Sequence, residues 1–236
     1  MNLAVWSGPR NLSTALMYSF AQRADCQIWD EPFYAAYLAR TGLDHPMRAQ
    51  ILAANDADYG SIITACTAPS DGLHYQKHMC QHLAAEDDLA WLSALTNVLL
   101  IRHPARVIAS YHAKRENPIV SDLGLDVQAQ IYARLSAQGE TPIVIDATDI
   151  RANPEGMLRA LCARLDISFD PKMLHWPKGG HKDDGVWAPH WYGAVWNSTG
   201  FSGAEGPVPK VPDELVPILK DCLHHYQRLA EVKISV

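Results

Sequence analysis

The sequence predicts an α/β fold in which a doubly wound parallel sheet carries helices on both faces. Short apolar runs of the kind found in buried parallel strands recur along the chain, separated by segments long enough for helical crossovers. Two of these runs lead through a turn into an amphipathic segment, as a strand, a loop and a helix do. The expected strands span residues 2–7, 26–30, 72–77, 97–102 and 142–146.

The first turn has the features of an anion-binding loop. The N–H groups of a helix's first turn lack intrahelical partners and the helix dipole is positive there, so such a turn stabilises a phosphate. Arg10 adds a permanent charge with forked donors, while Gly8 lets the backbone approach a ligand. A turn whose Asn11 and Ser13 only cap the helix is the structural alternative. The segment reads Ser7, Gly8, Pro9, Arg10, Asn11, Leu12, Ser13, Thr14.

The second turn follows the expected strand 97–102. Arg102 ends that strand, and Pro104 suits the first position of a helix that we expect to reach about Lys114. Ser110 falls about two turns into this helix. Arg102 and Ser110 can therefore converge on one phosphate group.

The remaining elements follow from the same signals. The run at 142–146 precedes an expected helix over about 153–165, and an amphipathic helix is expected over about 213–231. Between them, residues 170–209 lack regular periodicity and are rich in proline, glycine and tryptophan. This composition predicts an irregular but ordered flap within a single domain spanning residues 1–236.

The two turns together resemble the sulfotransferase family and its bacterial branch. The resemblance rests on Pro-Arg-x-x-Ser-Thr after the first strand and on Arg-x7-Ser after a later one. It implies a P-loop-NTPase-like α/β topology and an enzyme that uses 3′-phosphoadenosine 5′-phosphosulfate (PAPS) as sulfuryl donor. It further implies that residues 7–14 hold the 5′-phosphosulfate, and that Arg102 and Ser110 hold the 3′-phosphate.

The same resemblance extends to the flap. Lys178 and Gly179 are similar to a Lys-Gly element that closes over the 3′-phosphate in sulfotransferases. An ordered flap that covers an apolar edge explains the tryptophans of this segment equally well. Both interpretations stay open at the level of sequence.

Sulfuryl transfer requires a base for the acceptor proton and a positive group for the leaving oxygen. Asp30 and Glu31 follow the second expected strand, at the edge where open α/β sheets bind ligands. Glu31 resembles the base in a Glu-Pro element of some bacterial carbohydrate sulfotransferases. An acidic pair that caps a helix ahead of Pro32 is the alternative.

Lys77 and His78 lie at the end of the third expected strand and resemble a Lys-Thr-His element of cytosolic sulfotransferases. The resemblance assigns Lys77 to the transferring group and His78 to proton transfer. Here the histidine follows the lysine directly. Because adjacent strand residues face opposite sides, both reach the site only if the strand ends between them.

The resemblance therefore implies transfer of a sulfuryl group from PAPS to a hydroxyl or amine of a small molecule, with no metal. A nucleotide-dependent phosphotransferase is one alternative. It would use Asp146 for Mg²⁺, although the first loop lacks the lysine and second glycine of a Walker A motif. A non-catalytic nucleotide-binding protein of the same fold is another.

Composition restricts the partners. The 236 residues are 48% apolar and 19% charged, as in a globular domain, and no apolar run is long enough to span a membrane. No N-terminal signal pattern is present, so we expect a cytoplasmic protein. The net charge of −6 and the lack of basic runs argue against nucleic-acid binding. Homo-oligomer formation stays open.

Metal-ligand patterns are weak. The five cysteines have no Cys-x-x-Cys spacing, which argues against a disulfide framework or a structural zinc site. His74, His78 and His82 recur every four residues and would converge on a metal only if they shared one helix. We therefore expect no metal site.

Overall fold

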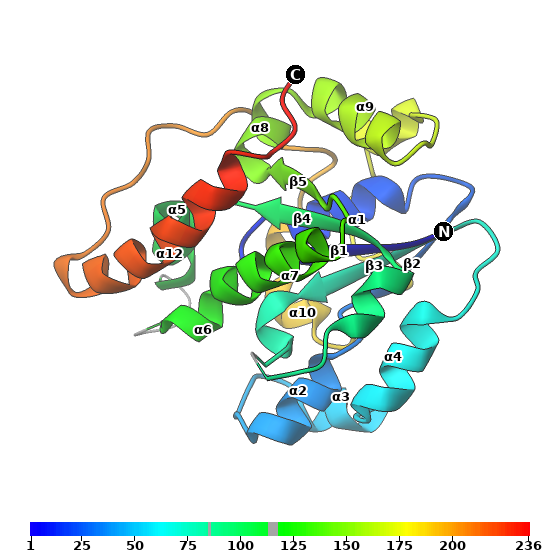
Figure 1. The fold of residues 1–236 in the computed structure, drawn as a ribbon. Helices are drawn as coiled ribbons and strands as arrows, with labels where there is room; N and C mark the ends of the chain where they lie inside the picture. Colours follow the sequence, from blue (N-terminus) through cyan, green and yellow to red (C-terminus); the bar gives the residue numbers. More distant parts are fainter. Residues whose placement is uncertain (85, 113–117) are drawn as a thin grey trace.

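A computed structural model describes residues 1–84, 86–112 and 118–236 of the chain (Figure 1). Lys114, where the sequence places the end of a helix, lies outside these residues. Within the described part of the chain, no helix has the length and apolar character needed to cross a membrane.

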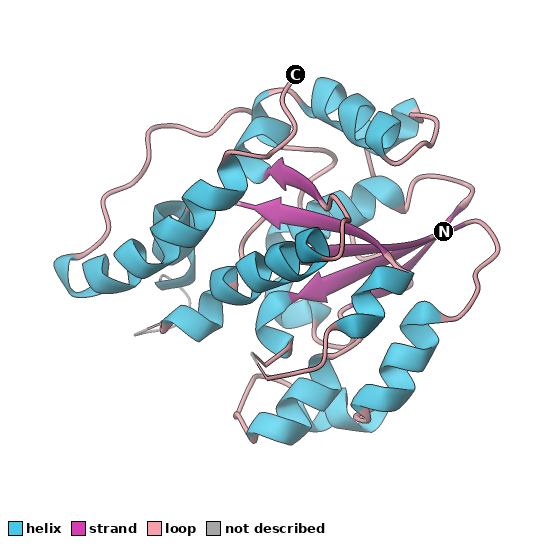
Figure 2. Ribbon diagram, in the orientation of Figure 1, coloured by secondary structure: helices cyan, strands magenta, loops and turns pink. Residues whose placement is uncertain are grey.

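A five-stranded parallel sheet forms the centre of the molecule (Figure 2). Its spatial order is β2-β3-β1-β4-β5. Each strand lies within two residues of its expected position, because each apolar run had the length and composition of a buried strand. The strands are β1 (Asn2–Ser7), β2 (Cys26–Asp30), β3 (Leu73–Met79), β4 (Thr96–Ile101) and β5 (Ile143–Asp146).

Helices cover both faces of the sheet, which confirms the doubly wound α/β class (Figure 1). The α-helices are α1 (Ser13–Phe20), α2 (Tyr34–Thr41), α3 (Arg48–Ala54), α4 (Tyr59–Thr67), α5 (Pro104–His112), α6 (Val120–Leu123), α7 (Leu125–Ala137), α8 (Ala147–Ala152), α9 (Pro154–Arg164), α10 (Ala188–Trp191), α11 (Gly193–Trp196) and α12 (Val216–Ala230). In the described ranges, short 3₁₀ helices are η1 (Cys80–His82), η2 (Ala90–Ala94), η3 (Pro171–Leu174) and η4 (Asp213–Leu215).

Successive side chains of a strand point to opposite faces of the sheet, so the apolar core has one part on each face. Leu3 and Val5 of β1 pack with α1 and α9, whereas Ala4 and Trp6 pack with α7 and the end of α12. Both sets are buried. A strand that is apolar on both faces must have a layer of helices on each side, so β1 lies at the centre of three layers.

The expected flap at 170–209 is part of the folded core. It contains η3, α10 and α11 and is closed by an antiparallel bridge between His175 and Gly200. Trp176, Trp187 and Tyr192 are buried against the α1 face of the sheet. The aromatic side chains therefore order a segment that has little regular secondary structure.

Candidate functional site

A cavity of about 660 Å³ opens at the carboxyl edge of the sheet. All five strands are parallel, so the loops that follow β1, β2, β3 and β4 meet there. β1 is hydrogen-bonded to β4, and the chain leaves these two strands in opposite directions across the sheet. This switch point brings together the two turns that the sequence singled out.

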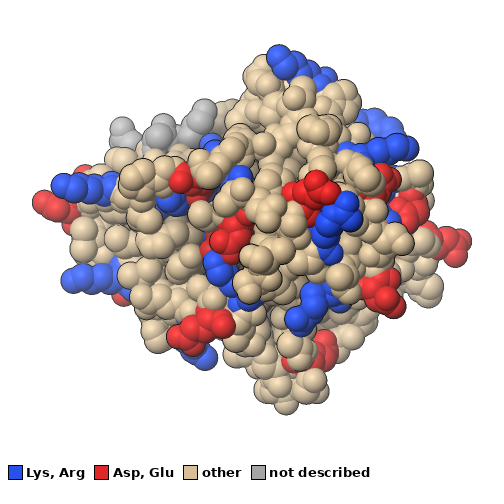
Figure 3. Space-filling model, turned by 90° about the horizontal axis from the view of Figure 1, so that it is seen from above, with Lys and Arg blue, Asp and Glu red and all other residues tan. Residues whose placement is uncertain are grey.

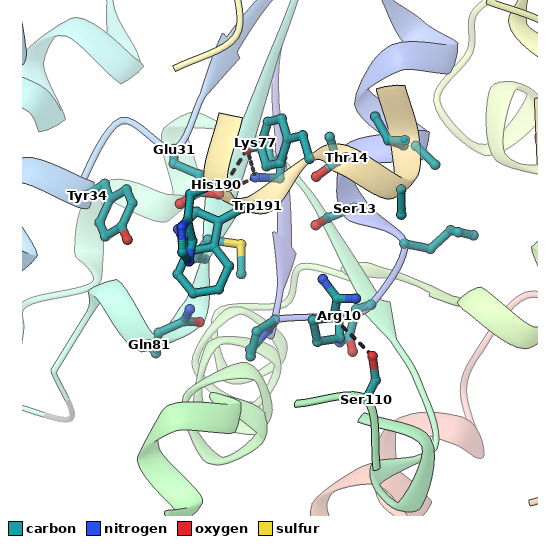
Figure 4. A pocket seen from close by; sticks show the side chains of 18 of the residues that line it. Arg10, Ser13, Thr14, Glu31, Tyr34, Lys77, Gln81, Ser110, His190 and Trp191 are labelled. Atoms are coloured by element: carbon teal, nitrogen blue, oxygen red, sulfur yellow. Dashed lines mark hydrogen bonds and ion pairs between the residues drawn. The ribbon is translucent and has the colours of Figure 1, made fainter. Parts of the chain in front are cut away.

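The pocket has a basic end and an aromatic end (Figure 4). Arg10, Ser13, Thr14 and Ser110 line the first end, together with Arg102 and Arg151. Tyr34, Gln81, His190 and Trp191 line the second, together with His45 and His82. Glu31 and Lys77 lie between the two ends.

The loop between β1 and α1 has the strain and the open helix start of an anion site. Arg10 and Leu12 have φ angles of 61° and 70°, a conformation that stores about 1–3 kcal/mol in each non-glycine residue. Leu12 is the N-cap of α1, and no side chain of the described residues caps this helix. The helix-capping alternative is therefore wrong for Asn11 and Ser13. The first N–H groups of α1 remain available to a ligand.

Asn11 instead stabilises the loop through hydrogen bonds to the loop's own backbone. Its buried amide, oriented to match its neighbours, accepts a hydrogen bond from the Gly8 N–H at 3.3 Å and donates to the Pro9 carbonyl at 3.2 Å. Ser7 and Gly8 lie behind the pocket and are not part of its lining. A Cβ on Gly8 would stand 2.1 Å from the Leu123 carbonyl oxygen, so packing against α6 is the reason for this glycine.

Arg102 and Ser110 meet the first loop directly. The Arg10 Nε donates to Ser110 Oγ at 3.0 Å, and an Arg102 guanidinium N–H donates to the Arg10 carbonyl at 2.5 Å. Burial and, secondarily, the charge of Arg102 lower the pKa of the Arg10 guanidinium from its ordinary value. Closely spaced cations of this kind are stabilised by an anion bound between them.

Lys77 is the centre of a buried charge cluster. Its Nζ donates to Asp30 Oδ1 at 3.0 Å, to Tyr192 Oη at 2.8 Å and to Glu31 Oε1. Burial alone would lower the pKa of Lys77, but the two carboxylates raise it above its usual value, so the ammonium stays charged. Burial raises the pKa of Asp30 against the opposing charge of Lys77.

Glu31 lines the pocket, and its backbone has a strained, left-handed conformation. Its φ is 45°, and its N–H donates to the Lys77 carbonyl at 2.9 Å. Asp30 is not part of the pocket lining, and it accepts hydrogen bonds from the Tyr192 hydroxyl at 2.7 Å and the Gly185 N–H at 3.2 Å. The turn therefore directs one carboxylate to the pocket and buries the other.

His82 belongs to this site, and sequence reasoning missed it. Its ring lies between Tyr34 and Tyr37, with centroid separations of 4.8 and 4.9 Å, and its Nε2 is 3.9 Å from Glu31 Oε2. Burial lowers the pKa of His82 well below its usual value, so the ring is neutral at physiological pH. His82 lies in η1, directly after β3 and so at the carboxyl edge of the sheet, and this position is the signal in the sequence that could have identified it.

His78 was wrongly predicted to share the site with Lys77. Its ring stacks on Trp6 at 4.2 Å and its Nε2 lies 3.1 Å from Gln76 Oε1, outside the pocket lining. The reason is that β3 continues to Met79. Lys77 and His78 therefore face opposite sides of the sheet.

The burial of His78 predicts a pH dependence of stability. Burial lowers the pKa of His78 to about 3, below its ordinary 6.5. Below about pH 6.5 the unfolded chain takes up a proton at this position and the native chain does not, so His78 alone lowers the free energy of unfolding by about 1.4 kcal/mol per pH unit as the pH drops toward 3, in addition to the contribution of His82. Urea unfolding between pH 7 and pH 5 measures the free energy of unfolding against pH. In His78→Gln its slope should be smaller, because the unfolded chain takes up one proton fewer. An unchanged slope would refute the assignment.

Lys178 and Gly179 also lie outside the pocket. Lys178 is exposed, and the Gly179 N–H donates to the Trp196 carbonyl at 2.8 Å. The flap instead lines the pocket with His190, Trp191 and Tyr192. The Lys-Gly assignment to the pocket is therefore wrong, because Gly179 is bonded to Trp196 within the flap and Lys178 beside it is exposed outside the pocket lining.

Asp146 is a structural residue. Its Oδ1 accepts the Thr148 N–H at 2.8 Å as the N-cap of α8, and its Oδ2 accepts the Tyr226 hydroxyl at 2.7 Å. It does not line the pocket. No cluster of three metal-ligating side chains was found in the described residues.

Comparison with known proteins identifies the family. A family model described as a sulfotransferase domain matches residues 1–231. The chain belongs to the sulfotransferase family. Among solved structures, this sulfotransferase-family chain is similar to a sulfotransferase domain from the curacin biosynthetic pathway, with a TM-score of 0.54 and 17% identity over 93% of this chain and 96% of that one. A sulfotransferase from Alicyclobacillus acidocaldarius gives 0.55 and 11% over 99% and 96%. These likenesses show the fold.

Two Arabidopsis thaliana proteins are closer in sequence. Branched-chain-amino-acid aminotransferase-like protein 1 is 40% identical over 84% of the chain, and protein 2 is 36% identical over 95%. The sulfotransferase-family chain spans only 36% and 40% of the length of these relatives. Their names describe the longer proteins.

Proposed function

We propose that the chain transfers a sulfuryl group from PAPS to a hydroxyl or amine of a small molecule. The observation that carries the proposal is the meeting of Arg10, Arg102 and Ser110 at one end of a pocket whose middle holds Glu31 and Lys77. Family membership supports the reaction class, and these residues support the donor.

In this proposal the donor lies along the basic end. The strained loop and the uncapped start of α1 bind the 5′-phosphosulfate, with Arg10, Ser13 and Thr14 as side-chain partners. Arg102 and Ser110 bind the 3′-phosphate. The acceptor enters from the aromatic end, between Tyr34 and Trp191 (Figure 4).

The transfer itself uses the central cluster. The acceptor oxygen or nitrogen forms a bond to sulfur while the bond from sulfur to the bridging phosphate oxygen breaks, and that oxygen leaves with the electron pair. Glu31 takes the acceptor proton. Lys77 holds Glu31 in place and supplies positive charge near the transferring group.

The geometry favours this over the phosphotransferase alternative. A Mg²⁺-dependent enzyme of that kind would need Asp146 at the pocket, whereas Asp146 caps α8. Calorimetric titration with adenosine 3′,5′-bisphosphate, beside ADP and ATP with and without Mg²⁺, separates the two. Preference for ATP with Mg²⁺ would overturn the proposal.

We further propose that the chain acts in the cytoplasm on a small molecule. The five cysteines are all unpaired, which suits a reducing compartment such as the cytoplasm. On the face seen in Figure 3, Lys and Arg side chains are interspersed with Asp and Glu. This mixture supports a small-molecule acceptor rather than a nucleic acid.

Arg102→Ala should weaken adenosine 3′,5′-bisphosphate binding by about one to two decades, or about 1.5–3 kcal/mol, because a charge-assisted contact to the 3′-phosphate is lost. Binding of adenosine 5′-phosphate should change little. Titration calorimetry measures both. Arg159→Ala is the matched control, since Arg159 is exposed on α9 and pairs with Glu155. Equal weakening of both nucleotides would contradict the assignment of Arg102.

A further inference from the structure

Glu205 is a buried carboxylate surrounded by three arginines. It lies in the irregular connection between α11 and η4, the orange segment that leads into α12 in Figure 1. Its side chain is only 2% exposed. Its Oε1 is 2.9 Å from Arg151 Nη1 and also pairs with Arg102, while its Oε2 is 3.0 Å from Arg106 Nε.

A hydroxyl completes this arrangement. Thr148 Oγ1 donates to Glu205 Oε2 at 3.1 Å. Three guanidinium groups and a hydroxyl form a donor set that suits a phosphoryl group, which carries more charge and more acceptor oxygens than a carboxylate. Burial would raise the pKa of Glu205, but its arginine partners, Arg102 foremost, lower it below the usual value. The carboxylate is therefore ionised at neutral pH.

The same arginines hold the backbone around Glu205. Arg151 Nε donates to the Gly203 carbonyl at 3.1 Å, and an Arg106 guanidinium N–H donates to the Gly206 carbonyl at 2.5 Å. We call residues 203–207 the strap. Since Arg102 and Arg151 also line the pocket beside Ser110, the strap carboxylate and a pocket ligand share these two cations.

We propose that Glu205 is a built-in competitor for the phosphoryl-binding arginines, which lowers the affinity of the pocket for 3′-phosphorylated nucleotides. The inference rests on the proposed function, because it takes the donor's 3′-phosphate as the competing group. With no ligand, Glu205 balances one of the three charges and keeps the guanidinium groups ordered. A bound phosphoryl group draws Arg102 and Arg151 partly away from the carboxylate and is repelled by its charge.

The test compares Glu205→Gln with the unaltered chain. The amide keeps the shape of the side chain and removes its charge. Calorimetric titration should show adenosine 3′,5′-bisphosphate binding at least about tenfold tighter to Glu205→Gln, because a like charge next to the phosphoryl group is gone. Adenosine 5′-phosphate should bind both proteins equally. The difference should shrink at high salt. Glu155→Gln, on the exposed surface of α9, is the matched control.

Opposite outcomes overturn the inference. Weaker bisphosphate binding to Glu205→Gln would mean that Glu205 only positions the arginines, and an equal gain for both nucleotides would exclude a specific effect on the 3′-phosphate. If Glu205→Gln does not fold, Thr148→Val replaces it. This variant removes one hydrogen bond that holds the carboxylate, and a smaller gain in bisphosphate affinity is expected.

A second measurement separates this inference from the proposed function. Inorganic phosphate should raise the Tm of Glu205→Gln more than that of the unaltered chain, because the substitution frees an anion position. This holds even if neither protein binds the bisphosphate, in which case the proposed donor is wrong. An equal effect of phosphate on both proteins would refute the competition.

Discussion

Glu31→Gln is expected to lower turnover by about 10²–10⁴-fold, the usual contribution of a general base, with little change in donor affinity. The amide keeps the size of the side chain but cannot take the acceptor proton. Initial rates at saturating PAPS, with an acceptor found by screening phenols, alcohols and amines, measure the first effect. Titration with adenosine 3′,5′-bisphosphate measures the second.

Two variants make this result specific. Asp30→Asn alters the neighbouring carboxylate, which does not line the pocket and accepts hydrogen bonds from Tyr192 and Gly185, and should reduce turnover far less. His82→Gln tests the other candidate base, 3.9 Å from Glu31 Oε2. Normal turnover in Glu31→Gln together with a large loss in His82→Gln would move the base role to His82.

Lys77→Met is expected to reduce the free energy of unfolding by about 3–5 kcal/mol, because it removes the ammonium group from a buried cluster and takes away the counter-charge that Lys77 gives to two carboxylates. The Lys77 and Asp30 side chains are both 1% exposed. Urea unfolding at pH 7 measures the change.

A second substitution distinguishes electrostatics from packing. Adding Asp30→Asn to Lys77→Met removes one of the unpaired charges and should recover part of the lost stability. Turnover should stay low in the double variant, since the positive charge beside Glu31 is still missing. Equal stability of the single and double variants would show that the loss came from packing at Lys77.

The fold and the two turns at the basic end of the pocket were predicted from short-range signals. Apolar runs marked all five strands, and the strand-turn-helix geometry after β1 and the Arg102–Ser110 spacing after β4 are properties of single turns. In the structure these two turns lie together, because β1 and β4 are neighbours and parallel strands place all such turns at one edge. The sequence therefore predicted the basic end of the pocket, which these two turns line.

His78 and Gly8 show where local reasoning failed. Lys77 was assigned to the right edge, but the length of β3 decides which of two adjacent side chains faces the pocket, and β3 extends beyond both. Gly8 was assigned to ligand approach, whereas the Leu123 carbonyl of α6 leaves no room for a larger residue there. Each outcome depends on a neighbouring element and not on the turn itself.

By itself, therefore, the sequence determined the α/β class, the strands and the two strand-turn-helix units that line the basic end of the pocket, since each depends on periodicity or backbone chemistry within about a dozen residues. Only the tertiary structure decided that Tyr192 and Trp191 of the flap reach the pocket beside Lys77, that His82 stands next to Glu31, and that Glu205 lies among the arginines. The physical reason is that these contacts arise from packing between elements far apart in the chain, which no local pattern encodes.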